Sequence, residues 1–408
     1  MLSINKIVSY QQNSFYQLYA FGLWGVQILL LFLYVFSLTD ESQTFTIPFR
    51  FLVVAFSLFI FMKYKSIRVL QQRQVVILVF IFYLFLVLRI LFDGFILDKN
   101  LGKSGATYLL QLGSTVIVPS LAFMTPLNSR NLMLAEKGLK HTCLVFLILG
   151  IFLYRENLGS DYRSLVHFND VKRETLISPM AFSYIGFTLL GLVMWETLIK
   201  KKIGAYNLIE AAIALYAMVW SASRGAIISL ILLLIYLTLS KTKRVSSFVK
   251  IIGIWIISIS LTMLALHYSG SHLLDRFETL RDGIETNSND VGSLRKGIWE
   301  RGFQQFSEQP FLGSGIEEKY IKYVAHNMYL ESLMATGLLG SLVFLVIILK
   351  TLKRGHHLLM VDSNAGWIGI LCMERMLTGL FSTSILDPIF WLPVVALHAN
   401  GTFIKKKT

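Results

Sequence analysis

The stretch that organises the predicted fold is Val291–Gly340, VGSLRKGIWERGFQQFSEQPFLGSGIEEKYIKYVAHNMYLESLMATGLLG. Its first two thirds are polar, and at His326-Asn327 it turns without a break into an apolar helical run. It lies in the longest water-facing segment of a chain that is otherwise mostly apolar. Any chemistry that takes place in water is therefore expected here.

The composition around this stretch is that of a membrane protein. Of the 408 residues, 55% are hydrophobic, 13% are aromatic and only 15% are charged, and the mean hydropathy is +0.62. Apolar runs of roughly 17 to 25 residues recur along the chain, each long enough to cross a hydrocarbon core of about 30 Å as a helix. The sequence therefore predicts an all-α polytopic membrane protein, with residues 1–408 forming a single integral membrane domain.

Hydropathy predicts twelve membrane spans, with boundaries good to a few residues. A large extracytoplasmic loop, 269–325, lies between spans nine and ten. The predicted spans are 15–37, 46–62, 74–92, 105–124, 139–154, 176–199, 204–220, 224–240, 249–268, 327–349, 364–383 and 387–404.

The connections between these spans alternate in charge. One set carries 21 basic residues and few acids, whereas the other carries 15 basic residues mixed with most of the acids. The positive-inside rule then places both termini in the cytoplasm. Arginine supplies 9 of the 15 outer basic residues but only 5 of the 21 inner ones. Because the arginine fork suits phosphate, the outer excess predicts an anion site at the outer membrane surface, and not a nucleic-acid footprint.

Within the large loop, two helices are expected before the apolar run begins. The first, near Leu273–Ile284, has an apolar face at helical spacing and reads as an interfacial amphipathic helix. The second runs from about Ser293 to Glu308, and on it Arg295 and Trp299 share a side. Pro310 ends this helix, and the glycines that follow predict a tight turn.

Two polar residues at span ends have both a structural and a functional interpretation. Arg224 lies in a Ser/Gly turn between spans seven and eight, where it could bind an anion or simply cap a helix end. His326 could act as a general base near neutral pH, although a lone histidine at a helix start is more often structural. The charges inside predicted spans, Arg89, Glu210 and Glu374-Arg375, could all be paired for folding.

Metal and nucleotide chemistry have little support in the sequence. Cys143 and Cys372 both fall inside spans, and the outer loops contain no Asp-x-Asp or His-x-x-x-His pair. The glycine-rich PFLGSGIEE lacks the Gly-Lys-Ser/Thr ending of a phosphate loop. We therefore expect no metal and no cofactor, and a substrate that arrives already activated in the membrane.

Taken in order, the motifs resemble those of the bacterial O-antigen polymerase and ligase superfamily. The match covers roughly 205–350 in detail and the whole chain in architecture. The motifs are Ser-x-Ser-Arg-Gly at 221–225, Arg295-x-x-x-Trp299, Pro310-x-x-Gly-x-Gly315, His326-Asn-x-Tyr-Leu-Glu331 and Gly337-Leu-Leu-Gly340.

This resemblance implies a metal-independent inverting glycosyltransferase with a GT-C-like membrane fold, acting on saccharides linked to undecaprenyl pyrophosphate. It implies that Arg224 and Arg295 engage the pyrophosphate and that His326 acts on the acceptor hydroxyl. The chemistry agrees, since two arginines can stabilise a departing pyrophosphate and the attacking hydroxyl needs a base. Further candidate substrate-binding residues are Arg163, Arg173, Arg301, Trp299, Asn327 and Glu331.

The family contains polymerases, which join repeat units, and ligases, which move the finished glycan to a lipid acceptor. Outer arginines between spans five and six, Arg155, Arg163 and Arg173, favour a polymerase of O-antigen, capsule or exopolysaccharide in the bacterial plasma membrane. The alternatives are a ligase, a transporter of lipid-linked or free saccharide, and a non-catalytic partner in an export complex. Expected partners are the lipid-linked glycan, membrane lipids, a flippase and a chain-length regulator, with no nucleic acid.

Overall fold

The structure is a computed structural model that describes 2–35, 42–64, 73–153, 179–241 and 291–400, except for 203, 222 and 362, together with the single residues 253 and 260. Apart from one isolated bridge between Glu318 and Tyr323, the regular elements in these ranges are helices. The chain forms two compact units, which are described in turn.

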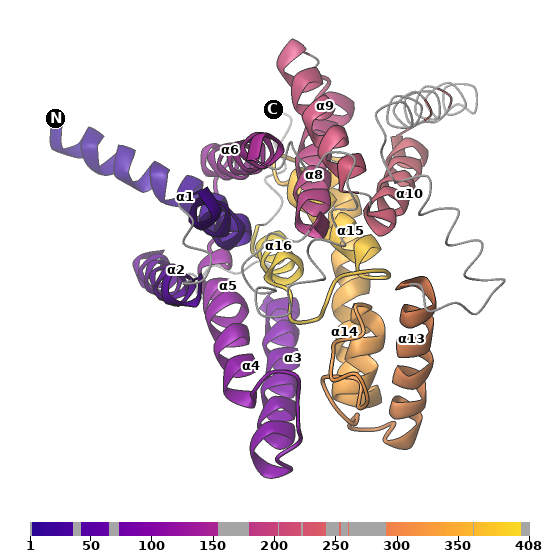
Figure 1. The fold of residues 1–408 in the computed structure, drawn as a ribbon. Helices are drawn as coiled ribbons and strands as arrows, with labels where there is room; N and C mark the ends of the chain where they lie inside the picture. The colour runs from indigo at the N-terminus through magenta and orange to yellow at the C-terminus, as the bar shows by residue number, and fades with distance from the viewer. Residues whose placement is uncertain are drawn as a thin grey trace. The chain divides into compact units, whose positions relative to one another are not determined.

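The first unit contains Met1–Phe49, Asn131–Arg281 and Leu359–Asp362. Within it α8 packs along α9 (Figure 1). The two helices lie close together at Gly186, which has no side chain: a Cβ atom added there would lie only 2.8 Å from the Ala214 carbonyl oxygen. Its helices are α1 (Leu2–Val35), most of α6 (Ser129–Leu153), α8 (Pro179–Met194) with its π-helical end η6 (Trp195–Ile199), α9 (Ala205–Trp220) and α10 (Arg224–Lys241).

The second unit contains Arg50–Arg130, Asp282–Leu358 and Ser363–Thr408, and it includes the stretch Val291–Gly340. In it α16 packs against α3, α5 and α15. Its helices are most of α2 (Ser42–Tyr64), α3 (Arg73–Leu91) continuing into η3 (Phe92–Ile96), α4 (Gly105–Gln111), η4 (Leu112–Ile117), α5 (Val118–Phe123), α13 (Val291–Glu308), α14 (Met328–Met360), α15 (Gly366–Thr378) and α16 (Pro388–Ala399).

Aromatic rings form the core of this second unit. The Phe82 ring of α3 stacks on Phe344 of α14 at 5.2 Å between centroids and lies 5.3 Å from Trp391 of α16. All three rings are buried. The Trp391 indole N–H, which would otherwise be left without an acceptor, donates to the Ile385 carbonyl at 2.7 Å. These ring contacts join α3, α14 and α16 in one core.

The helices follow the predicted spans. A helix occupies each of them except the ninth, 249–268, almost all of which lies outside the described residues. Among described residues, six helices are long and apolar enough to cross a membrane, and the all-α, multi-span membrane class is confirmed. The full count of twelve stays a prediction. The amphipathic helix near Leu273–Ile284 also lies outside the described residues.

The water-facing segment contains the second helix expected there, as α13, which begins two residues before the predicted start and ends at Glu308 as predicted. After Pro310 the chain turns and docks against a break in α14. The break is at Gly337, whose φ of 60° and ψ of −162° are not helical. There the Ser314 and Gly315 amides both donate to the Met334 carbonyl, at 2.8 and 3.1 Å, and the Leu338 amide donates to the Pro310 carbonyl at 2.7 Å.

Two glycines make this docking possible. Gly313 and Gly337 both have positive φ, 75° and 60°, which side chains other than glycine adopt at a cost. A Cβ atom at Gly313 would lie 2.4 Å from the Met334 carbonyl oxygen, and one at Gly337 would lie 2.3 Å from the Phe311 carbonyl oxygen. The glycines of the Pro-x-x-Gly-x-Gly motif and of Gly337-Leu-Leu-Gly340 are thus partly explained by backbone packing against backbone.

Gly337→Ala is expected to lower the free energy of unfolding by more than about 1 kcal/mol, because the new methyl group meets a carbonyl oxygen that cannot move aside. The measurement is the apparent thermal midpoint of the purified protein in detergent. Gly113→Ala is the matched control, since a Cβ atom there meets nothing within 4 Å. Equal midpoints for the two variants would contradict the docking described above.

Candidate functional site

The start of α14 fixes the backbone of His326. The Asn327 side-chain oxygen accepts from the Tyr329 and Leu330 amides at 3.1 and 3.2 Å, which makes Asn327 the N-cap of the helix. The Met328 amide donates to the Gly379 carbonyl at 3.0 Å. Directly before this cap, His326 has a φ of 53°, a left-handed conformation that costs a residue other than glycine roughly 1–3 kcal/mol and gathers at functional sites.

The carboxylate of Glu331 holds that backbone in place. It is buried, with 1% of its surface exposed, and it accepts hydrogen bonds from three donors. These are the His326 amide at 2.8 Å, the Ser384 hydroxyl at 2.6 Å and the Ile385 amide at 2.9 Å. One carboxylate therefore joins the end of the water-facing segment to the connection between α15 and α16, and it positions His326 through the backbone amide of that residue.

Helix α13 supplies the other side of the same region. The Trp299 indole N–H donates to the Ala325 carbonyl, one residue before His326, at 3.0 Å. One turn earlier on the helix, the Arg295 guanidinium donates to the Phe381 carbonyl at 3.0 Å and makes a longer contact, 3.5 Å, with the Ser382 hydroxyl. From the side of α13 that they are predicted to share, Trp299 thus contacts the residue before His326, and Arg295 contacts the connection between α15 and α16.

The imidazole of His326 is held as a neutral group. Burial lowers its pKa, and the positive charge of Arg295 lowers it further, to about 4. Its ring meets the Tyr323 ring edge to face, with 5.0 Å between centroids. Neither ring nitrogen is hydrogen-bonded to a residue that the structure describes. A neutral imidazole whose nitrogens are not engaged by described protein groups can accept a proton from a bound hydroxyl.

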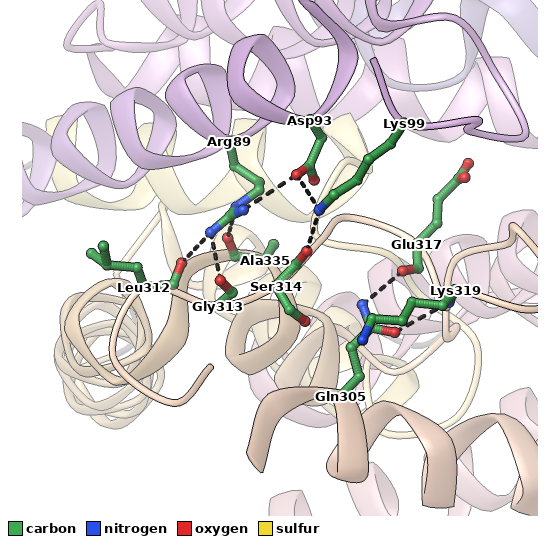
Figure 2. Close-up of polar contacts among 10 residues, drawn as sticks. All are labelled: Arg89, Asp93, Lys99, Gln305, Leu312, Gly313, Ser314, Glu317, Lys319 and Ala335. Carbon is green, nitrogen blue, oxygen red and sulfur yellow. Dashed lines mark hydrogen bonds and ion pairs between the residues drawn. The ribbon is translucent and has the colours of Figure 1, made fainter. Parts of the chain in front are cut away.

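A buried arginine from α3 holds the docked turn from the other side (Figure 2). The Arg89 guanidinium donates to three backbone carbonyls, those of Leu312 at 2.6 Å, Gly313 at 2.6 Å and Ala335 at 2.9 Å. Two of these carbonyls belong to the turn and the third lies beside the break in α14. Breaking a helix leaves carbonyls without their usual partners, and Arg89 supplies the missing donors. Arg89, interpreted from sequence only as an intramembrane charge, is thus a positioning residue.

Arg89 is paired with a carboxylate in the same cluster. Asp93 is fully buried one turn later, where it pairs with Arg89 at 3.3 Å and with Lys99 at 2.7 Å. Lys99 also donates to the Ser314 carbonyl at 2.6 Å (Figure 2). A buried charge is tolerated when it is paired and hydrogen-bonded, and these contacts pair Asp93 with both cations.

Further polar contacts fix the segment between the turn and His326. The Gln305 side chain donates to the Glu317 carbonyl at 3.0 Å and accepts from the Lys319 amide at 3.2 Å (Figure 2). Arg301 pairs through its Nε with the buried Glu318 carboxylate at 3.0 Å. Of the candidate substrate-binding residues, Arg301, Trp299, Asn327 and Glu331 thus make contacts that shape the site.

The remaining candidates lie elsewhere. Arg224 is the first residue of α10 in the first unit, half-buried after Ser223, whose carbonyl accepts from the Ile227 amide at 3.3 Å. Arg163 and Arg173 lie outside the described residues. That Arg224 converges with Arg295 and His326 stays a prediction.

The other intramembrane charges, Glu210, Glu374 and Arg375, also form ion pairs. Lys140 contacts Glu196 at 2.5 Å and Glu210 at 2.6 Å within the first unit. Glu374 and Arg375, adjacent on α15, pair at 2.8 Å and are both buried. Across the part of the chain that the structure describes, no three His, Cys, Asp or Glu side chains gather in a way that could hold a metal ion.

Sequence reasoning did not identify Arg89, Tyr323 or Glu318 as part of this region. Arg89 offered a signal, because an arginine near the end of a span needs acceptors. Its acceptors lie more than 220 residues away, and no local pattern could name them. Tyr323 and Glu318 have no spacing that separates them from other loop residues.

The fold and the site define a multi-span helical membrane protein whose water-facing segment is folded against the start of a membrane helix. Residues 210–345, from α9 into α14, match the family model described as O-antigen ligase. This match confirms the resemblance to the O-antigen polymerase and ligase superfamily that the motifs predict, over that part of the chain. No curated protein matches the chain.

Replacing Arg295 by Gln is expected to raise the pKa of His326 from about 4, since a nearby positive charge disfavours the imidazolium and its removal favours protonation. Only neutral imidazole reacts with diethyl pyrocarbonate, so the pH at which labelling of His326 is half-maximal, read by peptide mass spectrometry, reports this pKa. That pH should move upward in Arg295→Gln. Labelling of His357 is the internal control, and an unmoved midpoint at His326 would mean that the two groups do not interact.

Proposed function

We propose that this protein is a metal-independent inverting glycosyltransferase that polymerises a surface polysaccharide. Its substrates are repeat units linked to undecaprenyl pyrophosphate, and it works on the outer face of the bacterial plasma membrane with both termini in the cytoplasm. The observation that carries the proposal is the neutral imidazole of His326 near the charge of Arg295, with neither ring nitrogen hydrogen-bonded to a described residue. The family match at 210–345 supports chemistry on lipid-linked glycans in general.

In this mechanism the growing chain is the donor and a new lipid-linked unit is the acceptor. An acceptor hydroxyl gives its proton to His326 while its oxygen attacks the anomeric carbon of the donor sugar. The bond between that carbon and the pyrophosphate oxygen breaks, and the electron pair leaves with the lipid pyrophosphate. Attack opposite the leaving group inverts the anomeric configuration.

The two proposed arginines act on the leaving group. Arg224 and Arg295 would hold the pyrophosphate and stabilise the charge that develops as it departs, the role that a divalent metal plays elsewhere. Binding of the pyrophosphate would also offset the charge of Arg295 and raise the pKa of His326 from about 4 toward neutrality. A base with a pKa closer to the working pH is more effective, so donor binding would itself prepare His326 for proton transfer.

The described site residues have supporting roles in this scheme. Trp299, Asn327 and Glu331 would keep the His326 backbone in its left-handed conformation, and Arg301 would hold the neighbouring turn through Glu318. Arg163 and Arg173, in the outer connection between spans five and six, would bind the donor or acceptor pyrophosphate. A flippase that supplies units and a chain-length regulator are the expected protein partners.

A ligase is the second candidate, and the description of the matching family model favours it. The chemistry at His326 and the arginines would be the same, but the acceptor would be a lipid core and transfer would occur once per chain. The outer arginines of the connection between spans five and six favour the polymerase. A strain that lacks the gene separates the two, because loss of a polymerase leaves single repeat units on the acceptor, whereas loss of a ligase leaves long chains on undecaprenyl pyrophosphate.

Arg224→Ala, Arg295→Ala and His326→Ala are each expected to abolish the glycan ladder made in a deletion strain. Loss of a general base costs roughly 10²–10⁴ in rate, and loss of one donor to a developing charge costs roughly 10²–10³. Arg130→Ala and His357→Ala are the matched controls, since both residues are exposed on helices away from the site. Wild-type ladders from all three site variants, at equal membrane expression, would refute the site.

A transporter would also need these arginines for binding but would make no glycosidic bond. Purified protein supplied with lipid-linked units in detergent, where no second compartment exists, distinguishes the two activities. Elongation under these conditions supports the enzyme, and binding without elongation supports the transporter.

A further inference from the structure

The segment just before His326 is a short, rigid turn at 318–323. The Glu318 amide donates to the Tyr323 carbonyl at 3.0 Å and the Lys322 amide donates back to the Glu318 carbonyl at 2.9 Å. Inside the turn the Glu318 carboxylate accepts from the Tyr320 and Ile321 amides at 3.2 and 2.8 Å and from Arg301 at 3.0 Å. With 1% of its surface exposed, Glu318 acts as the core of the turn.

The turn is also held by its neighbours in the second unit. The Gly102 amide donates to the Glu317 carboxylate at 2.7 Å, and the Tyr108 hydroxyl donates to the other oxygen of that carboxylate. Gly102 lies so close that a Cβ atom there would be 2.2 Å from the Lys322 carbonyl oxygen. The turn therefore has little freedom to change shape, and the side chains it carries are presented in fixed positions.

The side chains presented are large, and they are exposed. Tyr320 has 79% of its surface exposed, Tyr323 has 52% and Ile321 has 46%. The turn is held by Glu318 and by backbone bonds, so these three side chains contribute little to its stability. An exposed aromatic group on a backbone that is already held indicates a binding surface, because little entropy of ordering is lost when a ligand arrives.

Tyr323 also lies against the proposed base. Its ring meets the His326 ring edge to face at 5.0 Å, with an interplanar angle of 67°. A flat group resting on the exposed part of Tyr323 would therefore have its edge near the imidazole. In a glycosyl transfer, the group that must come to the base is the acceptor sugar.

A pyranose ring has the chemistry that this surface suits. One face of the ring carries C–H groups and is apolar, while the hydroxyls project from its rim. Tyrosine offers an apolar ring face and a hydroxyl at its edge, with only two side-chain torsions to order. We infer that Tyr323, extended by Tyr320, forms the subsite for the acceptor sugar and directs one of its hydroxyls to His326. This inference rests on the proposed function.

A membrane-interface anchor is the other use of exposed tyrosines, and the surroundings of the turn argue against it. Helix α13, which holds the turn through Gln305 and Arg301, exposes charged side chains. Lys296 has 77% of its side-chain surface exposed, Glu300 has 66% and Glu308 has 48%. A helix with this face lies in water, as does the turn that packs on it.

The test measures sugar binding without turnover. The full-length protein in nanodiscs is titrated with the lipid-free, pyrophosphate-free repeat-unit oligosaccharide of its host, and the dissociation constant is read by calorimetry. Tyr323→Ala is expected to weaken binding roughly tenfold and Tyr320→Ala by less, whereas Tyr323→Phe, which keeps the ring, should stay within about threefold of wild type. Phe303→Ala is the control, because Phe303 is an equally exposed aromatic residue on α13 (55%) away from the turn.

Unchanged binding in Tyr323→Ala would overturn the subsite, as would wild-type protein that binds no oligosaccharide. Tyr323→Ala that lowers the thermal midpoint in nanodiscs but leaves sugar binding intact would identify a membrane anchor and equally overturn it. A different result would refute the proposed function, so the two failures can be told apart. Wild-type protein that binds the oligosaccharide through Tyr323 but never elongates a lipid-linked unit refutes the polymerase, while a normal ladder with unchanged binding in Tyr323→Ala refutes the subsite alone.

Discussion

The hydrogen bonds from Arg89 to three backbone carbonyls hold the water-facing segment against the break in α14. Without these donors, the carbonyls exposed by the break at Gly337 and by the turn at Gly313 would be buried without partners, at roughly 1–3 kcal/mol each. Asp93 pairs with the Arg89 cation, and Lys99 donates a third hydrogen bond to the same turn, at the Ser314 carbonyl. These hydrogen bonds fix one end of residues 316–327, the chain that leads from the turn to His326 and α14.

The residues around His326 divide between those that hold it and those that act on its charge. Glu331 and Trp299 both fix the peptide bond that precedes it, through the His326 amide and the Ala325 carbonyl. Arg295 and burial keep the imidazole neutral. A neutral base beside a cation is an arrangement that responds to the arrival of an anion, because the anion relieves the repulsion that a proton on His326 would meet. In the proposed mechanism, donor binding would therefore make His326 a stronger base.

Local patterns in the sequence predicted the helices, but not the contacts that assemble the candidate site. Apolar runs placed α3 and α14, and the polar pattern after Val291 placed α13 with Arg295 and Trp299 on one side. The match at 210–345 confirmed the resemblance that the motifs carry. The hydrogen bonds from Arg89 to the turn could not be predicted, since they join residues far apart in sequence through backbone carbonyls, which every residue type has. The same holds for Glu331, predicted to bind substrate, whose carboxylate contacts the backbone of His326.

The central claim is that Arg224 meets Arg295 on the outer face of the membrane. Cysteines introduced at 224 and 295, in a protein without Cys143 and Cys372, test it with a short, membrane-impermeant bifunctional thiosulfonate applied to intact cells or right-side-out vesicles. We expect an intramolecular cross-link for this pair. We expect none for cysteines at 130 and 295, which lie on opposite sides of the membrane in the predicted topology. Thiols at 224 and 295 that both react from outside yet never cross-link, or a thiol at 224 that reacts only from the cytoplasm, would contradict the central claim.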